Sequence, residues 1–261
     1  PEAVRRSADG CKIVFHLGSL IAIPYSYVNP LDFIQTNVLG TANVLNASSR
    51  DHVEKIVHTS TSEVYGTALY CPINERHPLQ AQSPYSASKI AADKLAESYY
   101  RSFDLPVAIA RPFNTYGPRQ SARAVIPTII LQTLNGNQVR LGSLYPTRDF
   151  TFVEDIVRGL ISVAKSQNSV GETVNLGCGK DISINDIAQK IFSIMGENRR
   201  ILRDDQRIRP EKSEVERLVC DNSKARELLR WEPKISLKEG LNRAIDWFRS
   251  HLGEYRTDYI I

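Results

Sequence analysis

With 261 residues, the chain is long enough for one sizeable hydrophobic core, or for one core and a small additional lobe. Its 42% apolar and 24% charged residues are ordinary for a globular protein, and a net charge of +4 with scattered basic residues argues against a nucleic-acid-binding role. No apolar run approaches the length of a membrane span, and no pair of cysteines has metal-ligand spacing. We therefore expect a cytoplasmic protein with reduced cysteines, without a metal site and without a membrane or nucleic-acid partner.

Short apolar runs alternate with longer segments of helical periodicity in the first part of the chain. The predicted elements there are strands at 13–18, 55–60 and 107–111, and helices at 30–49 and 84–103. Pro84 stands at the first position of its helix, where proline is favoured. This alternation is typical of βαβ units, so we predict an α/β fold with a Rossmann-like, doubly wound parallel sheet.

The alternation becomes less regular after residue 111. The predicted elements are helices at 125–134, 154–165, 183–195, 222–229 and 237–252, strands at 138–141 and 173–176, an extended segment at 149–153, and loops over 199–217. We assign residues 1–118 to a nucleotide-binding domain whose sheet also receives part of about 149–179. Residues 119–261 then form mainly a small substrate-binding lobe that is interleaved with this domain.

Polar side chains gather where the predicted parallel strands end, which is the edge where such sheets bind ligands. The second strand ends in Ser60, Thr61, Ser62 and Glu63. Shortly after it, Tyr85 and Lys89 stand four residues apart on one helix face, roughly 6 Å from each other. A nearby lysine is expected to lower the pKa of the phenol and make it a general base. Only Tyr85, among eleven tyrosines, has a lysine at this spacing, although a surface helix can carry the pair by chance.

Eight short segments carry a more specific signal through their order along the chain: HLGSL (16–20), NVLGTANVL (37–45), STSEVYG (60–66), PYSASK (84–89), RPFNTYGPR (111–119), RDFTFVED (148–155), NLGCG (175–179) and LLRWEP (228–233). Together they resemble the extended short-chain dehydrogenase/reductases, the NAD-dependent epimerase/dehydratase family. Within this family the chain looks most like the sugar-nucleotide 4,6-dehydratases. Among these it most resembles the enzymes that act on activated N-acetylhexosamines, as in legionaminic-acid-type pathways. The resemblance implies a role in cell-surface polysaccharide biosynthesis.

The resemblance implies a catalytic role for each residue of two of these segments. Tyr85 takes the proton of the sugar 4-hydroxyl as hydride leaves C4 for NAD, while Lys89 also binds the nicotinamide ribose and Thr61 hydrogen-bonds the 4-oxygen. Glu63 then removes the C5 proton, water leaves from C6, and the hydride returns to C6. Ser62 stands where glucose-type dehydratases carry the general acid, an aspartate, and mannose-type dehydratases carry serine. The identity of the acid therefore stays open.

The resemblance also implies ligand contacts and a partner. The implied cofactor contacts are Leu17, Gly18, Ser19, Ser60, Tyr85, Lys89, Arg111 and Pro112. The implied substrate contacts are Asn114, Arg148 and Arg209 at the nucleotide diphosphate or its ribose, and Ser26 near the sugar. Helices around 37–50 and 86–103 resemble the pair that forms a homodimer interface in relatives, although their apolar faces could equally cover only their own sheet.

Three alternative functions remain at this stage. UDP-glucuronate decarboxylases also carry Thr-Ser-Glu, whereas 4-epimerases usually carry a small uncharged residue in place of Glu63. The third alternative is a catalytically silent sugar-nucleotide-binding fragment, because the chain starts with Pro1 and its single methionine is Met195. We expect roughly 60 residues to precede it, with the glycine-rich turn, an acidic residue and a strand of the cofactor site. If they are physically gone, negligible NAD affinity is expected.

Overall fold

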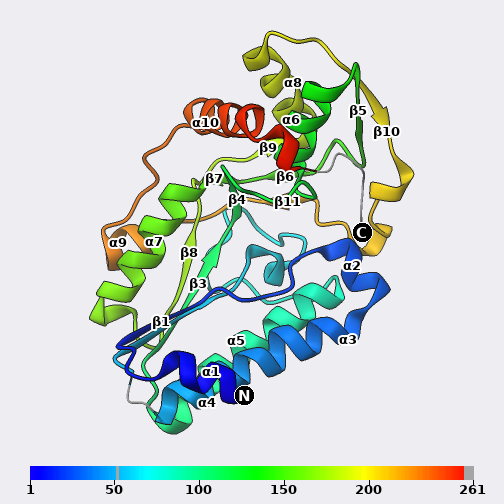
Figure 1. Ribbon diagram of the computed structural model, residues 1–261. Coiled ribbons are helices and arrows are strands. Elements are labelled where there is room, and N and C mark those ends of the chain that lie inside the picture. Colours follow the sequence, from blue (N-terminus) through cyan, green and yellow to red (C-terminus); the bar gives the residue numbers. More distant parts are fainter. Residues whose placement is uncertain (51–52, 256–261) are drawn as a thin grey trace.

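The computed structural model describes residues 1–50 and 53–255 and contains a four-stranded parallel sheet at its centre (Figure 1). Its strands are β1 (Ile13–His16), β2 (Lys55–Thr59), β3 (Val107–Pro112) and β8 (Thr173–Leu176), in the order β1-β2-β3-β8. All three pairings are parallel. The predicted α/β fold with a doubly wound sheet is therefore confirmed.

Helices cover both faces of this sheet because successive strand residues point to opposite sides. Ile56 and Ile109 pack against α4 (Gly40–Arg50) and α5 (Pro84–Phe103). Their neighbours Val57 and Ala108 pack on the other face, against α7 (Val153–Lys165) and α9 (Ser223–Leu229). Figure 1 shows these two helical layers on either side of the sheet.

The segment predicted as one helix at 30–49 is helical but divided. It consists of α3 (Pro30–Phe33), a π-helical stretch (Ile34–Leu39) and α4, and it follows a further short helix, α2 (Ile23–Val28). The π-helical stretch brings Asn37 inside, where its side-chain amide bonds both backbone groups of Leu20 and the hydroxyls of Ser19 and Ser88. Asn37 thereby fixes the segment after β1 to the start of α5.

A separate hydrophobic core lies in the second lobe. It is formed by α6 (Val125–Asn135), β5 (Gln138–Leu141), α8 (Ile184–Met195) and α10 (Leu237–Ser250). The region predicted as loops at 199–217 contains β10 (Arg200–Arg203), which pairs in parallel with β5, and β11 (Arg217–Leu218). The remaining elements are α1 (Glu2–Ala8), β4 (Asn114–Tyr116), β6 (Thr147–Arg148), β7 (Phe150–Phe152) and β9 (Ile182–Ser183).

Short sheets connect this lobe to the central sheet. Strand β6 lies between β11 and β9, and β4 pairs with β7 immediately after β3 ends. Arg148 in β6 and Asn114 in β4 are thus brought to the boundary between the two cores. In the described part of the chain, no helix is long and apolar enough to cross a membrane.

Candidate active site

The turn after β2 presents Glu63. Thr61 caps a 3-10 turn (Ser62–Tyr65), and its side-chain oxygen accepts a hydrogen bond of 3.2 Å from the Glu63 backbone N–H. The turn ends at Gly66, whose φ of 63° lies in the left-handed region that favours glycine. Glu63 is 8% exposed, so its carboxylate is held near the protein interior at the carboxyl end of the sheet.

Tyr85 and Lys89 lie in the first turns of α5, which begins as the sequence predicts. Ser83 and Ser86 form a reciprocal capping box around Pro84. Both predicted catalytic side chains are buried, and the Lys89 ammonium donates to the Thr59 carbonyl oxygen at 2.7 Å. The start of α5 is therefore anchored directly to the end of β2.

The structure brings Tyr85, Thr61 and Glu63 together, but it corrects the predicted ionisation of the phenol. Burial raises the pKa of Tyr85 above its usual range, the hydrogen bond with Thr61 opposes this, and the charge of Glu63 raises it further. The predicted lowering of the Tyr85 pKa is therefore wrong for the protein alone, because burial of the phenol dominates.

A buried network of charged and polar side chains joins α5 to β2 and β3 next to the predicted catalytic residues. Asp93, one turn after Lys89 in α5, accepts hydrogen bonds from His58 at 3.2 Å, Ser60 at 2.7 Å and two nitrogens of Arg111 at 2.9 and 3.1 Å. The third Arg111 nitrogen donates to the Tyr65 hydroxyl at 3.0 Å. Ser60 and Arg111 are predicted cofactor contacts, but their side chains are committed to this network. We now interpret both as supports that hold α5 against β2 and β3.

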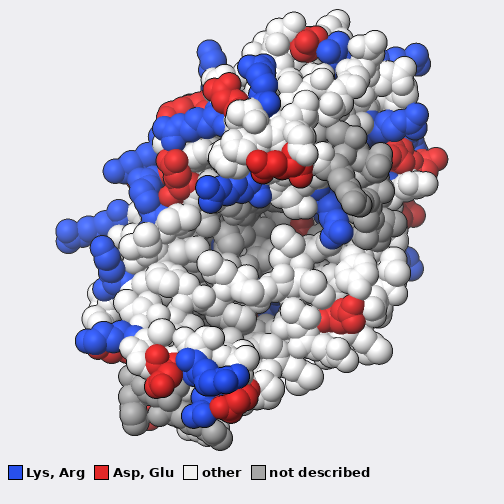
Figure 2. Space-filling model, viewed as in Figure 1, with Lys and Arg blue, Asp and Glu red and all other residues white. Residues whose placement is uncertain are grey.

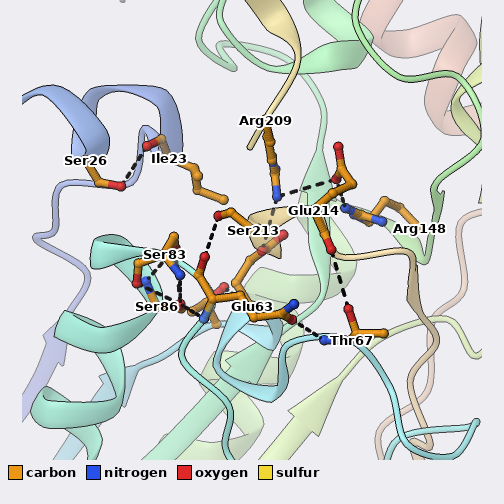
Figure 3. A network of polar contacts seen from close by, with 12 residues as sticks. Ile23, Ser26, Glu63, Thr67, Ser83, Ser86, Arg148, Arg209, Ser213 and Glu214 are labelled. Atoms are coloured by element: carbon orange, nitrogen blue, oxygen red, sulfur yellow. Dashed lines mark hydrogen bonds and ion pairs between the residues drawn. The ribbon is translucent and has the colours of Figure 1, made fainter. Parts of the chain in front are cut away.

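Two arginines meet above Glu63 (Figure 3). A nitrogen of Arg209 lies 3.5 Å from a Glu63 carboxylate oxygen and 4.0 Å from Glu214, and Arg148 lies 3.5 Å from the same Glu214 oxygen. Burial lowers the pKa of Arg148, partly opposed by the two glutamates. For Arg209, burial has the same effect, but Glu63 and Glu214 outweigh it and its pKa is raised. The predicted substrate arginines thus converge on one place beside the predicted base.

The other predicted contacts have mixed outcomes. The Asn114 side-chain oxygen is buried and has no partner among the described residues, as a ligand contact would leave it. Ser26 is fully buried, and its hydroxyl donates to the Ile23 carbonyl oxygen within α2 at 2.7 Å (Figure 3). The predicted substrate contact of Ser26 is therefore not supported. Of the predicted cofactor contacts, Leu17 and Gly18 are exposed after β1. The Ser19 hydroxyl donates to the Asn37 side chain, and Pro112 is partly buried at the end of β3.

Comparison with known proteins decides the family. A family model described as GDP-mannose 4,6 dehydratase matches residues 6–244. The chain belongs to this family. It is also 33% identical to dTDP-glucose 4,6-dehydratase of Streptomyces antibioticus, over 91% of this chain and 70% of that one. UDP-glucuronic acid decarboxylase 1 of Xenopus tropicalis is 34% identical, over 92% of this chain and 57% of that one.

A solved structure supports the same assignment. The dTDP-glucose 4,6-dehydratase DesIV of Streptomyces venezuelae, in complex with NAD, aligns with a TM-score of 0.90 and 28% identity. The alignment covers 98% of this chain and 78% of DesIV. The predicted membership of the NAD-dependent epimerase/dehydratase family is therefore confirmed.

The residues at the ends of β1 and β2 fit the cofactor of this family, NAD. The Thr59 hydroxyl is buried without a partner among the described residues, and Lys89 has three N–H groups but one described acceptor. Space is open around Gly18, where an added Cβ would meet no atom within 4 Å. Thr59 and Lys89 can thus hold a ribose, and NAD, when bound, supplies the hydride acceptor.

Three supporting residues were not predicted: Asn37, Asp93 and Glu214. The role of Asp93 could have been predicted from the sequence, because Asp93 follows Lys89 by four residues and lies on the same helix face as Tyr85. The role of Glu214 could not, since it lies in a charged stretch whose fold depends on contacts with distant segments.

Proposed function

We propose that this protein catalyses the NAD-dependent dehydration of a nucleotide-activated hexose to its 4-keto-6-deoxy derivative. The observation that carries the proposal is the carboxylate of Glu63 beside a pair formed by the buried Tyr85 phenol and Thr61, whose side chains are close enough to interact. The pair suits proton removal from a sugar hydroxyl. A carboxylate next to it suits removal of a second proton, from the neighbouring carbon, which simple oxidation and reduction at C4 does not need.

The proposed chemistry assigns the proton transfers to Tyr85 and Glu63. Tyr85 accepts the proton of the 4-hydroxyl, with Thr61 bonded to the same oxygen, as hydride leaves C4. The resulting 4-keto group acidifies the C5 proton, which Glu63 removes. Because a serine hydroxyl is not a general acid near neutral pH, whereas a protonated carboxyl group is, we assign to Glu63 also the delivery of this proton to the departing C6 hydroxyl. The hydride then returns to C6, C5 takes up a proton from solvent, and Tyr85 releases its proton to solvent, so the net change is the loss of one water.

Arg148, Arg209 and Asn114 are proposed to hold the nucleotide diphosphate or its ribose. A guanidinium group presents a planar set of donors that matches phosphate oxygens. The resemblance to enzymes of N-acetylhexosamine pathways makes UDP-N-acetylhexosamines the first substrates to test. We propose that the reaction belongs to cell-surface polysaccharide biosynthesis and takes place in the cytoplasm.

Incubation with NAD and UDP-, GDP-, dTDP- and CDP-hexoses, followed by mass spectrometry, tests this function. We expect one of them to yield a product lighter by one water that carries a 4-keto group. Release of carbon dioxide from UDP-glucuronate would instead establish the decarboxylase, and recovery of a 4-epimer of unchanged mass would establish an epimerase. Binding of a nucleotide sugar without any turnover would favour a silent binding protein.

We also propose a homodimer formed through the helices that include α4 and α5. One support is the largely uncharged face over α2 and α3 in Figure 2. Another is the exposure of apolar side chains in α3, the π-helical stretch and the end of α5: Leu31, Ile34, Leu39 and Phe103 are between 48% and 65% exposed. Light scattering should give twice the 29.4 kDa chain mass. Leu39→Glu should give a monomer, and a monomeric wild-type protein would contradict the proposal.

The two hydrophobic cores support a division into two interleaved domains. We propose residues 1–118 with part of about 149–179 as the nucleotide-binding domain, and mainly 119–261 as the substrate-binding lobe.

A further inference from the structure

Glu214 occupies the space between the two predicted diphosphate ligands. One of its carboxylate oxygens faces a nitrogen of Arg148 at 3.5 Å and a nitrogen of Arg209 at 4.0 Å (Figure 3). Its side chain is 11% exposed, and that of Arg148 is 6% exposed. A single carboxylate oxygen therefore serves two guanidinium groups in a place largely withdrawn from water.

The charges explain why a carboxylate is needed there. Two like charges that share a buried place repel each other, and a buried cation without a counter-ion is strongly destabilising. Burial lowers the pKa of Arg148, and the charge of Arg209 lowers it further. Glu214 and Glu63 bring the cluster to zero net charge. A diphosphate group would bring further negative charge. It would need the guanidinium N–H donors of the two arginines, which these carboxylates now face.

The contacts of Glu214 are long for ion pairs. Hydrogen-bonded pairs of this kind usually measure ~2.7–2.9 Å, whereas the carboxylate contacts of the two arginines measure 3.5, 3.5 and 4.0 Å. Arg148 makes one shorter bond, of 2.9 Å, to the Thr147 carbonyl oxygen. The guanidinium groups thus keep donors that a better-placed anion can take.

The backbone around Glu214 is held more firmly than its side chain. The neighbouring Ser213 hydroxyl donates to the Gln82 carbonyl oxygen and lies 2.6 Å from the Tyr27 hydroxyl, and Val215 on the other side is buried in a core. The Glu214 carbonyl oxygen accepts from Thr67 at 3.5 Å. The carboxylate can therefore turn away by side-chain rotation while the chain stays in place.

We propose that Glu214 is a resident counter-ion that stands in for the substrate's diphosphate and is displaced by it when the nucleotide sugar binds. The proposal rests on the proposed function, because it takes Arg148 and Arg209 as the diphosphate ligands. Glu214 stabilises the pair of arginines in the empty protein, and the same carboxylate competes with the nucleotide. Its removal must therefore have opposite effects on the stability of the empty protein and on nucleotide affinity.

Calorimetric binding of UDP, GDP, dTDP and CDP to wild-type protein and to Glu214→Gln tests the exchange. We expect Glu214→Gln to lower the thermal unfolding midpoint of the empty protein and to bind the preferred nucleotide roughly threefold to tenfold more tightly. Glu216→Gln is the matched control, since it makes the same change of charge two residues away at an exposed side chain. Its affinity should equal that of the wild type.

The possible results separate the exchange from the proposed function. Weaker or unchanged nucleotide affinity in Glu214→Gln overturns the exchange, because the carboxylate would then contact the nucleotide or merely support the fold. An equal gain in nucleotide affinity in Glu216→Gln overturns it too. If Glu214→Gln does not fold, Glu214→Asp replaces it, because this variant moves the carboxylate away from the arginines by one methylene group. It should increase nucleotide affinity by a smaller factor, and an unchanged affinity overturns the proposal. Arg148→Ala should abolish binding. Wild-type protein that binds none of the four nucleotides would refute the proposed diphosphate site, and the exchange with it.

Discussion

At the scale of single residues, the proposed function makes Glu63 the side chain that distinguishes dehydration from reversible oxidation at C4. Glu63→Gln keeps the size of the side chain but cannot accept the C5 proton, so we expect product formation to fall ~100-fold or more. Turnover in deuterium oxide supplies a second measurement, because wild-type product should carry deuterium at C5. The exposed Glu211→Gln variant should match the wild type. Unchanged turnover in Glu63→Gln would exclude the assigned base.

Tyr85 shows what sequence reasoning can and cannot provide at this scale. Its pairing with Lys89 follows from helical spacing, and the structure places both residues at the predicted edge of the sheet. The direction of the pKa shift could not be predicted, because it depends on the burial of the phenol and on the neighbouring side chains of Thr61 and Glu63. For Ser26, too, sequence does not show that its hydroxyl donates to a carbonyl oxygen within α2, and the structure gives its predicted substrate contact no support.

At the scale of elements, Asp93 connects α5 with β2 and β3. Burial alone would raise its pKa, but His58, Arg111 and Ser60 outweigh this and hold the pKa of Asp93 below its usual range. Asp93→Asn leaves the Arg111 guanidinium buried without its counter-charge, and we expect the free energy of unfolding to fall by about 3–5 kcal/mol. Urea denaturation measures the change. Asp246→Asn, at an exposed ion pair, should cost less than about 0.5 kcal/mol, and equal losses would contradict the interpretation.

The elements that sequence predicts well are those defined by local signals. Helix α5 has its bounds as predicted because Ser83 and Pro84 fix its start and an amphipathic pattern continues to Phe103. Strand β10 escaped prediction, since it is stabilised by pairing with β5, about sixty residues earlier in the chain. The π-helical stretch before α4 depends in the same way on the contacts of Asn37 with distant backbone groups. Local pattern therefore accounts for the sheet and its helices, and tertiary pairing accounts for the parts that carry the arginines.

At the scale of the whole molecule, the buried His58 and the half-buried His16 make stability depend on pH. Burial, then the charges of His58 and Lys89, lower the pKa of His16 to about 4. Burial also lowers the pKa of His58, although Asp93 opposes this. The unfolded chain, with histidine pKa values near ~6.5, binds more protons than the folded protein below that pH. The free energy of unfolding must therefore rise with pH across this window and fall on acidification, for His16 from about pH 6.5 toward its folded pKa of about 4.

His16→Gln tests this linkage, because glutamine can keep the hydrogen bond to Thr41 without taking up a proton. We expect the variant to lose less stability than the wild type between pH 7 and pH 5, by about 1–2 kcal/mol, in urea denaturation followed at each pH. His58 keeps part of the dependence, so the slope should be reduced rather than abolished. The depressed pKa of Asp93 adds a further loss only below about pH 4, where its carboxylate would take up a proton on unfolding. An identical slope in wild type and variant between pH 7 and pH 5 would show that His16 is not kept neutral by the fold.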